Sequence, residues 1–502
     1  MSTKAEMLGS PDDSLFDALT MPLFAQAAAS KPTPVLASVG HPERSHGMIE
    51  GIKPYAEYKE SGLPWAPRVP AHWSLIPNRA VLRKRKILVG GNHKNFQLLS
   101  LTKGGVIVRD ISTGKGKFSS DMGTSQEVRK GDFVFCLFDV PETPRTVGLS
   151  PHDGMITGAY TVFESRKLPT AGVRYLERFY LAMDDQKLLS PLYSGLRHTI
   201  PPPRFLGTKT PQPPPDEQAA IVRFLDYANR KIDGFIRTKR KLIGLLNEQK
   251  RAIIHRAVTR GLHPDVPLKP SGIPWLGDIP KHWAVSRVKN EFKCLNPQRI
   301  PLSSTQRGAM TARIYDYYGA SGIIDKVENF IFDDDLLLIA EDGANLVLRN
   351  LPLAIIAKGK FWVNNHAHIL KPKRGNLEYL AGFMETLNYQ PWISGAAQPK
   401  LTKDRIMGIA IAVAPVSEQT AIVEYFTQST SPLRAAIART QREIALMQEY
   451  RTRLTADIVT GKLDVREAVT KLPDLPAEPI AEPIADDVPD EIETEGSTHE
   501  EN

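Results

Sequence analysis

The stretch Ser61-Gly62-Leu63-Pro64-Trp65, followed by Val-Pro at 69–70 and His-Trp at 72–73, returns as Ser271-Gly272-Ile273-Pro274-Trp275 with Ile-Pro at 279–280 and His-Trp at 282–283. A second phrase, Glu-Gln-x-Ala-Ile-Val, occupies residues 217–222 and returns at 418–423. A spacing of this length is far beyond the roughly 20–50 residues of a solenoid repeat. The sequence therefore predicts two tandem domains of one fold with pseudo-twofold symmetry.

Length and charge agree with two domains and indicate a polyanionic partner. The chain has 502 residues, about three times an ordinary domain. Its formal net charge is +8, yet Leu472–Asn502 hold 11 acidic and no basic residues, so the residues before them carry +19. Such a basic body attracts nucleic acid. An alternative is that the surface lysines only keep the protein soluble.

Cysteine usage and hydropathy indicate a cytoplasmic protein. The two cysteines, Cys136 and Cys294, cannot build a disulfide framework or a zinc site of the CxxC type, which favours a reducing compartment. No run approaches the roughly 18 apolar residues of a membrane span, and Asp12 and Asp13 flank the N-terminal apolar stretch unlike a signal peptide. We expect a soluble protein that is not exported.

Composition and local pattern divide the chain into six parts. Short strand-like runs at 132–138 and 160–163 precede a helical run at 174–183, and 335–340, 367–370 and 377–387 repeat that plan, as expected for α/β domains. The acidic tail is either a solvated segment or a competitor of nucleic acid for the basic surface. The predicted parts are a flexible extension at 1–55 with a short helix near 15–24, a first domain at 56–212, a long helix at 213–262, a second domain at 263–414, a second long helix at 415–465, and a disordered acidic tail at 466–502.

The two long helices carry a heptad pattern. Apolar residues recur at seven-residue spacing in both, which predicts a coiled coil, and chain connectivity predicts an antiparallel pair. The pattern is interrupted at matching polar positions, so we expect Lys239 and Thr440 to meet at the centre. Alternatively, each helix packs on its own domain and Lys239 extends to solvent. The predicted packing residues are Leu225, Ile232, Lys239, Leu246 and Ile253 in the first helix and Phe426, Leu433, Thr440, Met447 and Leu454 in the second.

The sequence shows no catalytic constellation. It lacks GxxxxGK[ST], GxSxG and HExxH, as well as the Asn/Asp-Pro-Pro-Tyr signature of amino-methyltransferases. His366 and His368 alternate on a strand and could share a metal, but no third ligand stands at a suitable spacing. The acids at 333–335 with Glu341 and Asp342 are better explained by a turn than by a nuclease cluster. We therefore predict no catalytic residue and no metal site.

Basic and amide side chains provide candidates for DNA contacts. Lysine and arginine engage phosphates, while arginine and glutamine also read base edges in the major groove. Taken alone, each of these residues is more often a solvated surface charge than a DNA contact. The candidates are Arg79, Arg83, Lys84, Arg85, Lys115, Lys117, Arg197, His198, Gln398, Lys400, Lys403 and Arg405.

Taken together, these motifs resemble the specificity subunits of type I restriction-modification systems. The resemblance covers about residues 58–465 and leaves out the N-terminal extension and the acidic tail. The motifs that carry it are the two Ser-Gly-x-Pro-Trp openings with their His-Trp pairs, the Pro-Pro-x-x-Glu-Gln helix start, Gly195-Leu196-Arg197-His198-Thr199-Ile200, Asn364-Asn365-His366-Ala367-His368 and Gln398-Pro399-Lys400-Leu401.

The resemblance implies two target-recognition domains, each reading half of a split double-stranded DNA site, joined by two helices that act as a ruler. It also implies that catalysis lies on partners. Two methylation subunits would carry S-adenosylmethionine, and restriction subunits would carry ATP and Mg²⁺, so the complex would methylate adenine or cut DNA. A coiled coil holding the domains about 50–65 Å apart spans more than one DNA turn of about 34 Å, which predicts an unread gap. The alternatives are a methylation-only complex, a coiled-coil protein adaptor and a self-sufficient nuclease.

Overall fold

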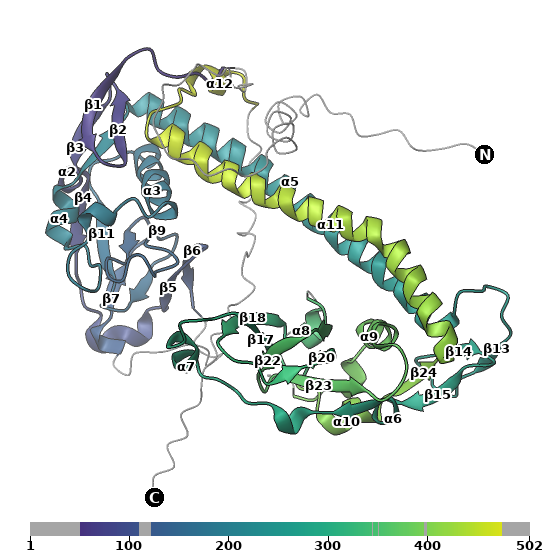
Figure 1. Ribbon diagram of the computed structural model, residues 1–502. Helices are drawn as coiled ribbons and strands as arrows, with labels where there is room; N and C mark the ends of the chain where they lie inside the picture. The colour runs from purple at the N-terminus through teal and green to yellow at the C-terminus, as the bar shows by residue number, and fades with distance from the viewer. Residues whose placement is uncertain (1–50, 110–121, 344, 350, 396–398, 474–502) are drawn as a thin grey trace, which may run out of the picture. The chain divides into compact units, whose positions relative to one another are not determined.

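The computed structural model describes residues 51–109, 122–343, 345–349, 351–395 and 399–473. The chain divides into two compact units, and the division crosses both long helices (Figure 1). Of the described residues, the first unit contains those of 51–238 and 444–473, and the second contains those of 239–443. Each unit thus joins one α/β domain to the start of one long helix and the end of the other, α5 (Pro215–Arg260) and α11 (Val416–Val459).

The first domain is built on a four-stranded antiparallel sheet in the order β4-β11-β8-β9. The helix α3 (Thr170–Asp185) follows the last of these strands. The sheet strands are β4 (Leu82–Arg85), β8 (Phe133–Phe135), β9 (Val147–Leu149) and β11 (Thr161–Ser165). Paired strands around the sheet are β1 (Tyr58–Leu63) with β2 (Ala66–Pro70), β3 (Ser74–Pro77) with β12 (Lys209–Gln212), β5 (Leu99–Thr102) with β6 (Gly105–Val108), and β7 (Gln126–Val128) with β10 (Gly154–Ile156). Short helical segments are α2 (Asn78–Val81), η1 (Gly90–Asn95), η3 (Met122–Thr124), η4 (Ser190–Leu192), α4 (Pro202–Gly207) and α12 (Arg466–Thr470).

The second domain repeats this sheet as β16-β23-β20-β21, followed by α9 (Leu377–Thr386). Its strands are β16 (Phe292–Cys294), β20 (Leu336–Ala340), β21 (Ala354–Ala357) and β23 (Ala367–Pro372). A second sheet, β18-β17-β22-β19, combines β17 (Tyr315–Gly319), β18 (Gly322–Val327), β19 (Phe332–Asp333) and β22 (Lys360–Val363). The remaining elements are β13 (Leu268–Pro270) with β14 (Asp278–Pro280), β15 (Ala284–Arg287) with β24 (Ala410–Val413), α6 (Val288–Glu291), η5 (Asn296–Gln298), α7 (Ser304–Gly308), α8 (Asn345–Leu348), η6 (Gln390–Trp392) and α10 (Lys403–Gly408).

The two domains share one layer and differ in the other. In both main sheets, the first and fourth strands along the chain are neighbours, and the second and third strands complete the sheet. In β20, Leu337 and Ile339 pack in the cluster that contains α9, while Leu336 and Leu338 pack against the second sheet. Alternation along a strand places these pairs on opposite faces. In β8, Phe133 and Phe135 likewise pack with α3, and Val134 packs with the hairpins. The helix-covered face is therefore common, and the opposite face carries different elements.

The long helices lie antiparallel within each unit. In the first unit, Ile232 and Ile236 of α5 pack against Met447 of α11, and Arg451 forms an ion pair with Asp233. In the second unit, the end of α5 and the start of α11 enter one cluster, which contains Ala257, Val258, Ile422 and Phe426. The predicted α/β fold class with two long antiparallel helices is confirmed.

The predicted packing residues occupy different environments along the helices. Leu225, Ile232, Phe426, Thr440, Met447 and Leu454 are buried, whereas Leu246, Ile253 and Leu433 are half-buried. The repeat predicted that Lys239 meets Thr440. The structure pairs the Lys239 ammonium with Glu443 at 2.7 Å, while the Thr440 hydroxyl donates to the Ala436 carbonyl of its own helix at 2.8 Å.

Two predicted boundaries need correction. Ile52 and Tyr55, assigned to the flexible extension 1–55, are buried in the core of the first unit. Part of the predicted tail 466–502 forms α12, and Ala468 and Val469 enter the same core. The N–H of Asp464 donates to the carbonyl of Lys53 at 2.7 Å, so the two segments hold each other. Local composition could not show this because each segment acquires its apolar partners only from the other end of the chain. The predicted helix near 15–24 and the acidic residues from 474 onward lie outside the described residues.

Candidate nucleic-acid interface

The two repeated phrases of the sequence meet in space. The indole N–H of Trp73 donates to Glu217 at 2.9 Å, and His72 contacts the same carboxylate at 2.8 Å. In the second unit, Trp283 and His282 contact Glu418 at the same two distances. Each opening motif is therefore hydrogen-bonded to the first turn of a long helix, where the helix dipole also favours a carboxylate.

The opposite end of a long helix completes each arrangement. The Tyr175 hydroxyl lies 3.0 Å from the carbonyl of Val459, at the end of α11. The Tyr379 hydroxyl lies 3.4 Å from the carbonyl of Val258, at the end of α5. Burial raises the pKa of both tyrosines, so the hydroxyls remain protonated donors. We call these repeated contacts the frame: Trp73, Glu217, Tyr175 and Gly461 in the first unit, and Trp283, Glu418, Tyr379 and Gly261 in the second.

A hairpin lies against the loop that follows the central strand of the first domain. Ser194 and Thr199 exchange backbone hydrogen bonds of 2.9 and 3.0 Å, which close the hairpin. Its far side is fixed to the loop because the N–H of Asp139 donates to the Arg197 carbonyl at 2.9 Å and the N–H of Ile200 donates to the Leu137 carbonyl at 2.8 Å. We call residues 137–139 with 194–200 the first strand-end site.

The second domain has the same connection after its own central strand. Ser394 and Lys400 exchange backbone hydrogen bonds of 2.9 and 2.8 Å. The N–H of Leu401 donates to the Glu341 carbonyl at 2.7 Å, and the N–H of Gly343 donates to the Pro399 carbonyl at 3.2 Å. Residues 341–343, 394–395 and 399–401 form the second strand-end site. Gln398, a predicted DNA contact, lies outside the described residues.

The first strand-end site presents an exposed cation. The Arg197 guanidinium donates to the Asp139 carboxylate at 2.7 Å, and its side chain is 74% exposed. Hydrogen bonding to Asp139 raises the pKa of Arg197 above its usual range. His198 is also exposed, and its ring lies 5.7 Å from the Tyr193 ring. Both predicted residues thus stand at the surface, with Arg197 oriented by a carboxylate that the sequence did not single out.

The second strand-end site rests on a buried polar network. Arg299 donates to Glu341 at 2.5 Å and to the carbonyl of Ala367 at 3.0 Å. His368 is fully buried, and one ring nitrogen lies 2.7 Å from the Leu401 carbonyl while the other lies 2.9 Å from the Asn296 amide. These partners define a neutral imidazole that donates to the carbonyl and accepts from the amide. Burial lowers the pKa of His368, in agreement with a neutral ring.

This network supports the backbone and leaves one cation near the surface. Lys400 lies 3.5 Å from Glu341, and its side chain is 52% exposed. His366 contacts the Asp342 carboxylate at 2.9 Å. Within the described ranges, no group of three His, Cys, Asp or Glu side chains is placed to hold a metal ion. The two histidines therefore act as local hydrogen-bonding groups in this structure.

Arg85 does not fit the predicted role of DNA contact, and Arg405 also makes a contact within its own domain. Arg85 is buried and forms ion pairs with Asp132 and, at 3.5 Å, with Glu127. Its sequence neighbours Arg83 and Lys84 are exposed, so a basic run read from sequence mixed one interior residue with surface ones. Arg405 donates to the Trp392 carbonyl at 2.9 Å, and the equivalent Arg204 donates to the Pro191 carbonyl at the same distance. A contact repeated in both domains supports the fold.

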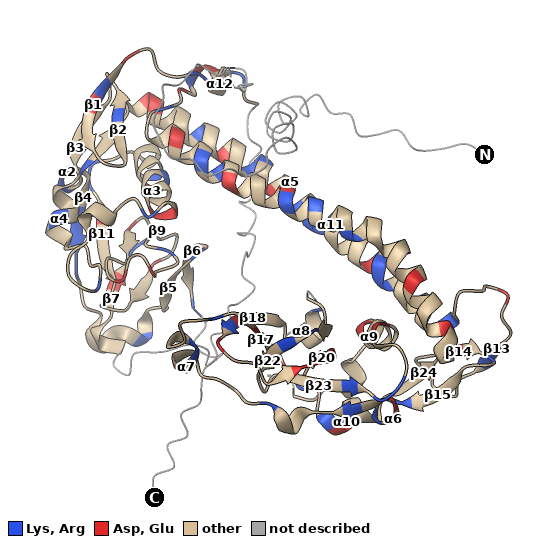
Figure 2. Ribbon diagram, in the orientation of Figure 1, with Lys and Arg blue, Asp and Glu red and all other residues tan. Residues whose placement is uncertain are grey.

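The other predicted cations are at the surface or outside the described residues. Arg79 and Lys403 are exposed, and Arg83 is exposed with an ion pair to Glu164. Lys115 and Lys117 lie outside the described residues. Basic residues are mixed with acidic ones along α5 and α11, and the short helices α4 and α10 also carry basic residues (Figure 2). These short helices directly follow the strand-end sites in the chain.

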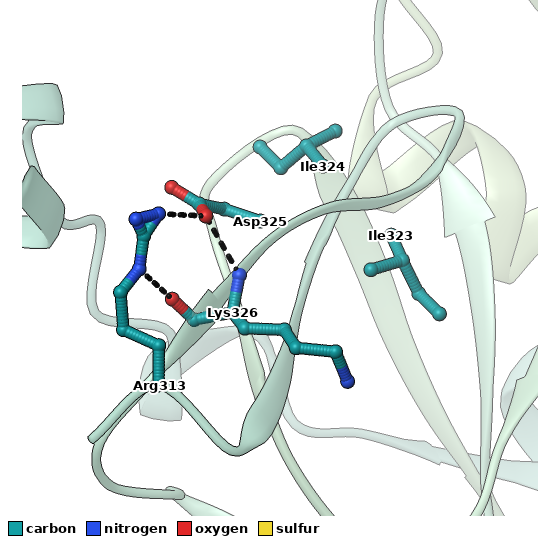
Figure 3. A pocket seen from close by; sticks show the side chains of 5 residues that line it. All are labelled: Arg313, Ile323, Ile324, Asp325 and Lys326. Carbon is teal, nitrogen blue, oxygen red and sulfur yellow. Dashed lines mark hydrogen bonds and ion pairs between the residues drawn. The ribbon is translucent and has the colours of Figure 1, made fainter. Parts of the chain in front are cut away.

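A shallow hollow lies at β18 in the second sheet of the second domain (Figure 3). Ile323 and Ile324 line it together with Arg313, Asp325 and Lys326. The Arg313 guanidinium donates to Asp325 at 2.8 Å and to the Lys326 carbonyl at 3.2 Å. Its polar groups are thus already bonded to one another. The hollow lacks the convergent free polar groups of a small-molecule site.

Comparisons with known proteins identify the class. Residues 280–445 match the family model described as type I restriction modification DNA specificity domain. A putative type I restriction enzyme specificity subunit, S.HindORF215P of Haemophilus influenzae, is 36% identical over 139 residues, which are 27% of this chain and 34% of that relative. The putative type I restriction enzyme MjaX specificity subunit of Methanocaldococcus jannaschii is 26% identical over 280 residues, which are 51% of this chain and 60% of that relative. The matches span between about a third and just under two thirds of these relatives' lengths.

Solved structures of type I restriction-modification proteins share little sequence with the chain. A chain of a type I R-M system has 15% identity and a TM-score of 0.47, with 78% of this chain and 98% of that chain covered. The HsdS subunit from Thermoanaerobacter tengcongensis has 16% identity and a TM-score of 0.33 at the same coverage.

The second domain therefore matches the model of a type I restriction modification DNA specificity domain, and the first domain shares its sheet order and its frame. The chain is similar to proteins named as specificity subunits of type I restriction enzymes. None of the helices in the described part of the chain is long and apolar enough to cross a membrane.

Proposed function

We propose that this chain selects the DNA target of a type I restriction-modification complex by reading one half-site with each domain. The observation that carries the proposal is the contrast between a frame repeated contact by contact and two strand-end sites made of different residues. Equivalent frames suit equivalent partners, and different surfaces suit different half-sites. The exposed cations Arg197 and Lys400 lie in the two corresponding hairpins, where they could engage phosphates or base edges.

The proposal assigns catalysis to partner subunits. Two methylation subunits would bind S-adenosylmethionine and modify adenine, and restriction subunits would bind ATP and Mg²⁺ and cut DNA. This chain would supply the target and the scaffold. The similarity of the second domain to a type I restriction modification DNA specificity domain favours this assignment, and the similar proteins are themselves named specificity subunits.

The direct test is a map of adenine methylation in cells with and without this chain. We expect a motif of two short sequences separated by an unread gap, which disappears with the chain. Methylation that stays the same in both strains would contradict the proposal. A second measurement is DNA binding by the assembled complex at increasing salt. A chain that reads DNA should bind in a sequence-selective way and lose affinity steeply with salt, whereas a chain that only links proteins should show no such binding.

A change of helix length tests the ruler. Deleting Lys239–Leu245 together with the equivalent residues 440–446 removes one heptad from each helix, or about 10 Å at about 1.5 Å per residue. We expect the gap in the methylated motif to shrink by about three base pairs at about 3.4 Å each, with both half-sites unchanged. A deletion in one helix alone is the control, because it breaks the pairing instead of shortening it. An unchanged gap in the double deletion would contradict the ruler.

A further inference from the structure

Leu196 stands at the tip of the first hairpin, completely in water. Its exposed fraction is 100%, and the next most exposed large apolar side chain of the described residues, Ile314, reaches 63%. Single exposed leucines are common on protein surfaces, so exposure alone means little. The meaning here depends on how the hairpin holds this side chain.

The hairpin backbone around Leu196 is fixed at several points. Gly195 has a φ of +68° and His198 has a φ of +42°, the second being an uncommon conformation for a residue with a side chain. The exchanged hydrogen bonds of Ser194 and Thr199 close the base of the hairpin. The N–H of His198 donates to the Gly195 carbonyl at 3.2 Å, which fixes the tip. Strain that surrounding contacts maintain is characteristic of functional sites.

Asp139 anchors the hairpin from the loop after β8. Its N–H donates to the Arg197 carbonyl at 2.9 Å, and its carboxylate accepts from the Arg197 guanidinium at 2.7 Å. One residue therefore fixes both the backbone and the cation next to the leucine. Leu196 is exposed on a rigid support, so its position in solvent is a property of the fold.

The tip has the shape and chemistry of a groove reader. A single leucine offers too little apolar area for a stable protein interface, which buries about 800 Å² on each partner. Its neighbours Arg197 and His198 are exposed donors, suited to phosphates and to base edges. An apolar tip next to such donors matches the edge of a base pair, where groups such as the thymine methyl make apolar contacts.

We propose that Leu196 is a specificity-determining residue that contacts a base pair of the half-site read by the first domain, with Asp139 as its positioning residue. This inference rests on the proposed DNA-reading function. The second hairpin has Ala396, Ala397 and Gln398 between Gly395 and Pro399 and contains no leucine. The effect of Leu196 should therefore be confined to one half-site.

The test compares the full chain, Leu196→Ala and the control Leu88→Ala, each assembled with its methylation subunits. Leu88 is 56% exposed in the same domain but lies outside the hairpin. Binding is measured on duplexes that carry every single base-pair substitution in both half-sites. We expect Leu196→Ala to bind the cognate duplex roughly ten-fold more weakly and to lose a similar factor of discrimination at one or two adjacent base pairs. The other half-site should keep its profile, and Leu88→Ala should match the unmodified chain.

Three results can be told apart. An unchanged substitution profile for Leu196→Ala would overturn the inference. A loss of affinity that is equal for all sequences would overturn it too, because it would indicate a contact without base preference. If the unmodified complex showed no preference for any split sequence, the proposed function itself would fail. Leu196→Met should retain most of the discrimination, since it restores an apolar side chain of similar size.

Discussion

The frame and the strand-end sites are next to each other in both units, yet they differ in how closely the two units match. In the frame, Trp73 and Trp283 donate to Glu217 and Glu418 at the same distance of 2.9 Å. In the strand-end sites, an exposed Arg197–Asp139 pair in one unit corresponds to a buried network around His368 in the other. Identical contacts occur where a domain holds two helices, and different contacts occur where we propose that each domain meets DNA. The comparison separates residues that build the scaffold from residues that can determine specificity.

The strongest way to break the frame is to add one carbon at its glycines. Gly461 has a φ of +80°, and a Cβ there would lie 2.3 Å from Cδ of Pro70. The proline ring cannot rotate away, so Gly461→Ala should destabilise the first unit by about 3 kcal/mol through strain and overlap. The equivalent Gly261→Ala meets its nearest atom, Oε1 of Glu418, at 3.1 Å and should cost about 1–2 kcal/mol.

Hydrogen exchange at increasing urea concentrations, read separately in peptides from each unit, would measure both effects. Separate readouts are needed because a chain with two units need not unfold in one step. Equal losses in the two variants would contradict the predicted difference between Gly461 and Gly261.

The carboxylates of the frame give the next largest effect. Glu217 is buried and accepts from Tyr55, Trp73 and His72, whereas Glu418 is less buried and accepts from Trp283 and His282. Removing a buried acceptor leaves its donors unsatisfied. We expect Glu217→Ala to cost about 3 kcal/mol and Glu418→Ala about 1.5 kcal/mol by the same exchange measurement. Glu217→Gln is the control, because it keeps an acceptor in place. A larger loss for Glu418→Ala would mean that Tyr55 adds nothing to the first frame.

The paired arginines test the comparison at lower cost. Arg204 and Arg405 both donate to a carbonyl at 2.9 Å, Arg204 donates to a second carbonyl at 3.4 Å, and both arginines are exposed. Replacement by alanine should cost about 1 kcal/mol in either unit. If the repeated contact marks a scaffold role, neither variant should change the sequence of the methylated motif. An altered half-site after Arg405→Ala would instead support the prediction from sequence that Arg405 contacts DNA.

Sequence patterns predicted the parts that repeat or have a period. The opening motifs, the Glu-Gln helix starts and the heptads predicted two domains and two long helices because these signals are local or repeated. The order of strands in the sheets could not be predicted, since pairing such as β11 with both β4 and β8 joins residues far apart in the chain. The core residues near both ends of the first unit were missed for the same reason, because Ile52 and Val469 belong to a core built from segments far apart in the chain.

The candidate site was less predictable than the fold. The sequence does not show which acidic residue a basic residue pairs with, so Arg85 could not be distinguished from Lys84. The structure shows that Arg85 is buried in an ion pair with Asp132. Leu196 belongs to a motif that carries the family resemblance, but its proposed role depends on its exposure and on the backbone conformation around it. Neither property can be predicted from composition. Asp139 could not be found by comparing the two halves of the chain, because the residue that makes the equivalent backbone contact in the second domain is Gly343, which has no carboxylate.

The smallest predicted effect is a pH dependence confined to the second unit, which alone contains the buried His368. Burial lowers the pKa of this ring below the value of about 6.5 that it has in the unfolded chain. The unfolded state therefore binds a proton at higher pH than the folded state, and stability must fall as pH decreases from about 6.5 toward the lowered pKa. Above about 6.5 the ring is neutral in both states and contributes no slope. We expect peptides of β20 and β23 to exchange faster at pH 5.5 than at pH 7.5, after correction for the intrinsic rate, by more than peptides of β8 and β11. His368→Gln, which keeps a donor and an acceptor but cannot be protonated in this range, should remove most of the difference between the units. A difference that persists in this variant would assign the pH dependence to another group.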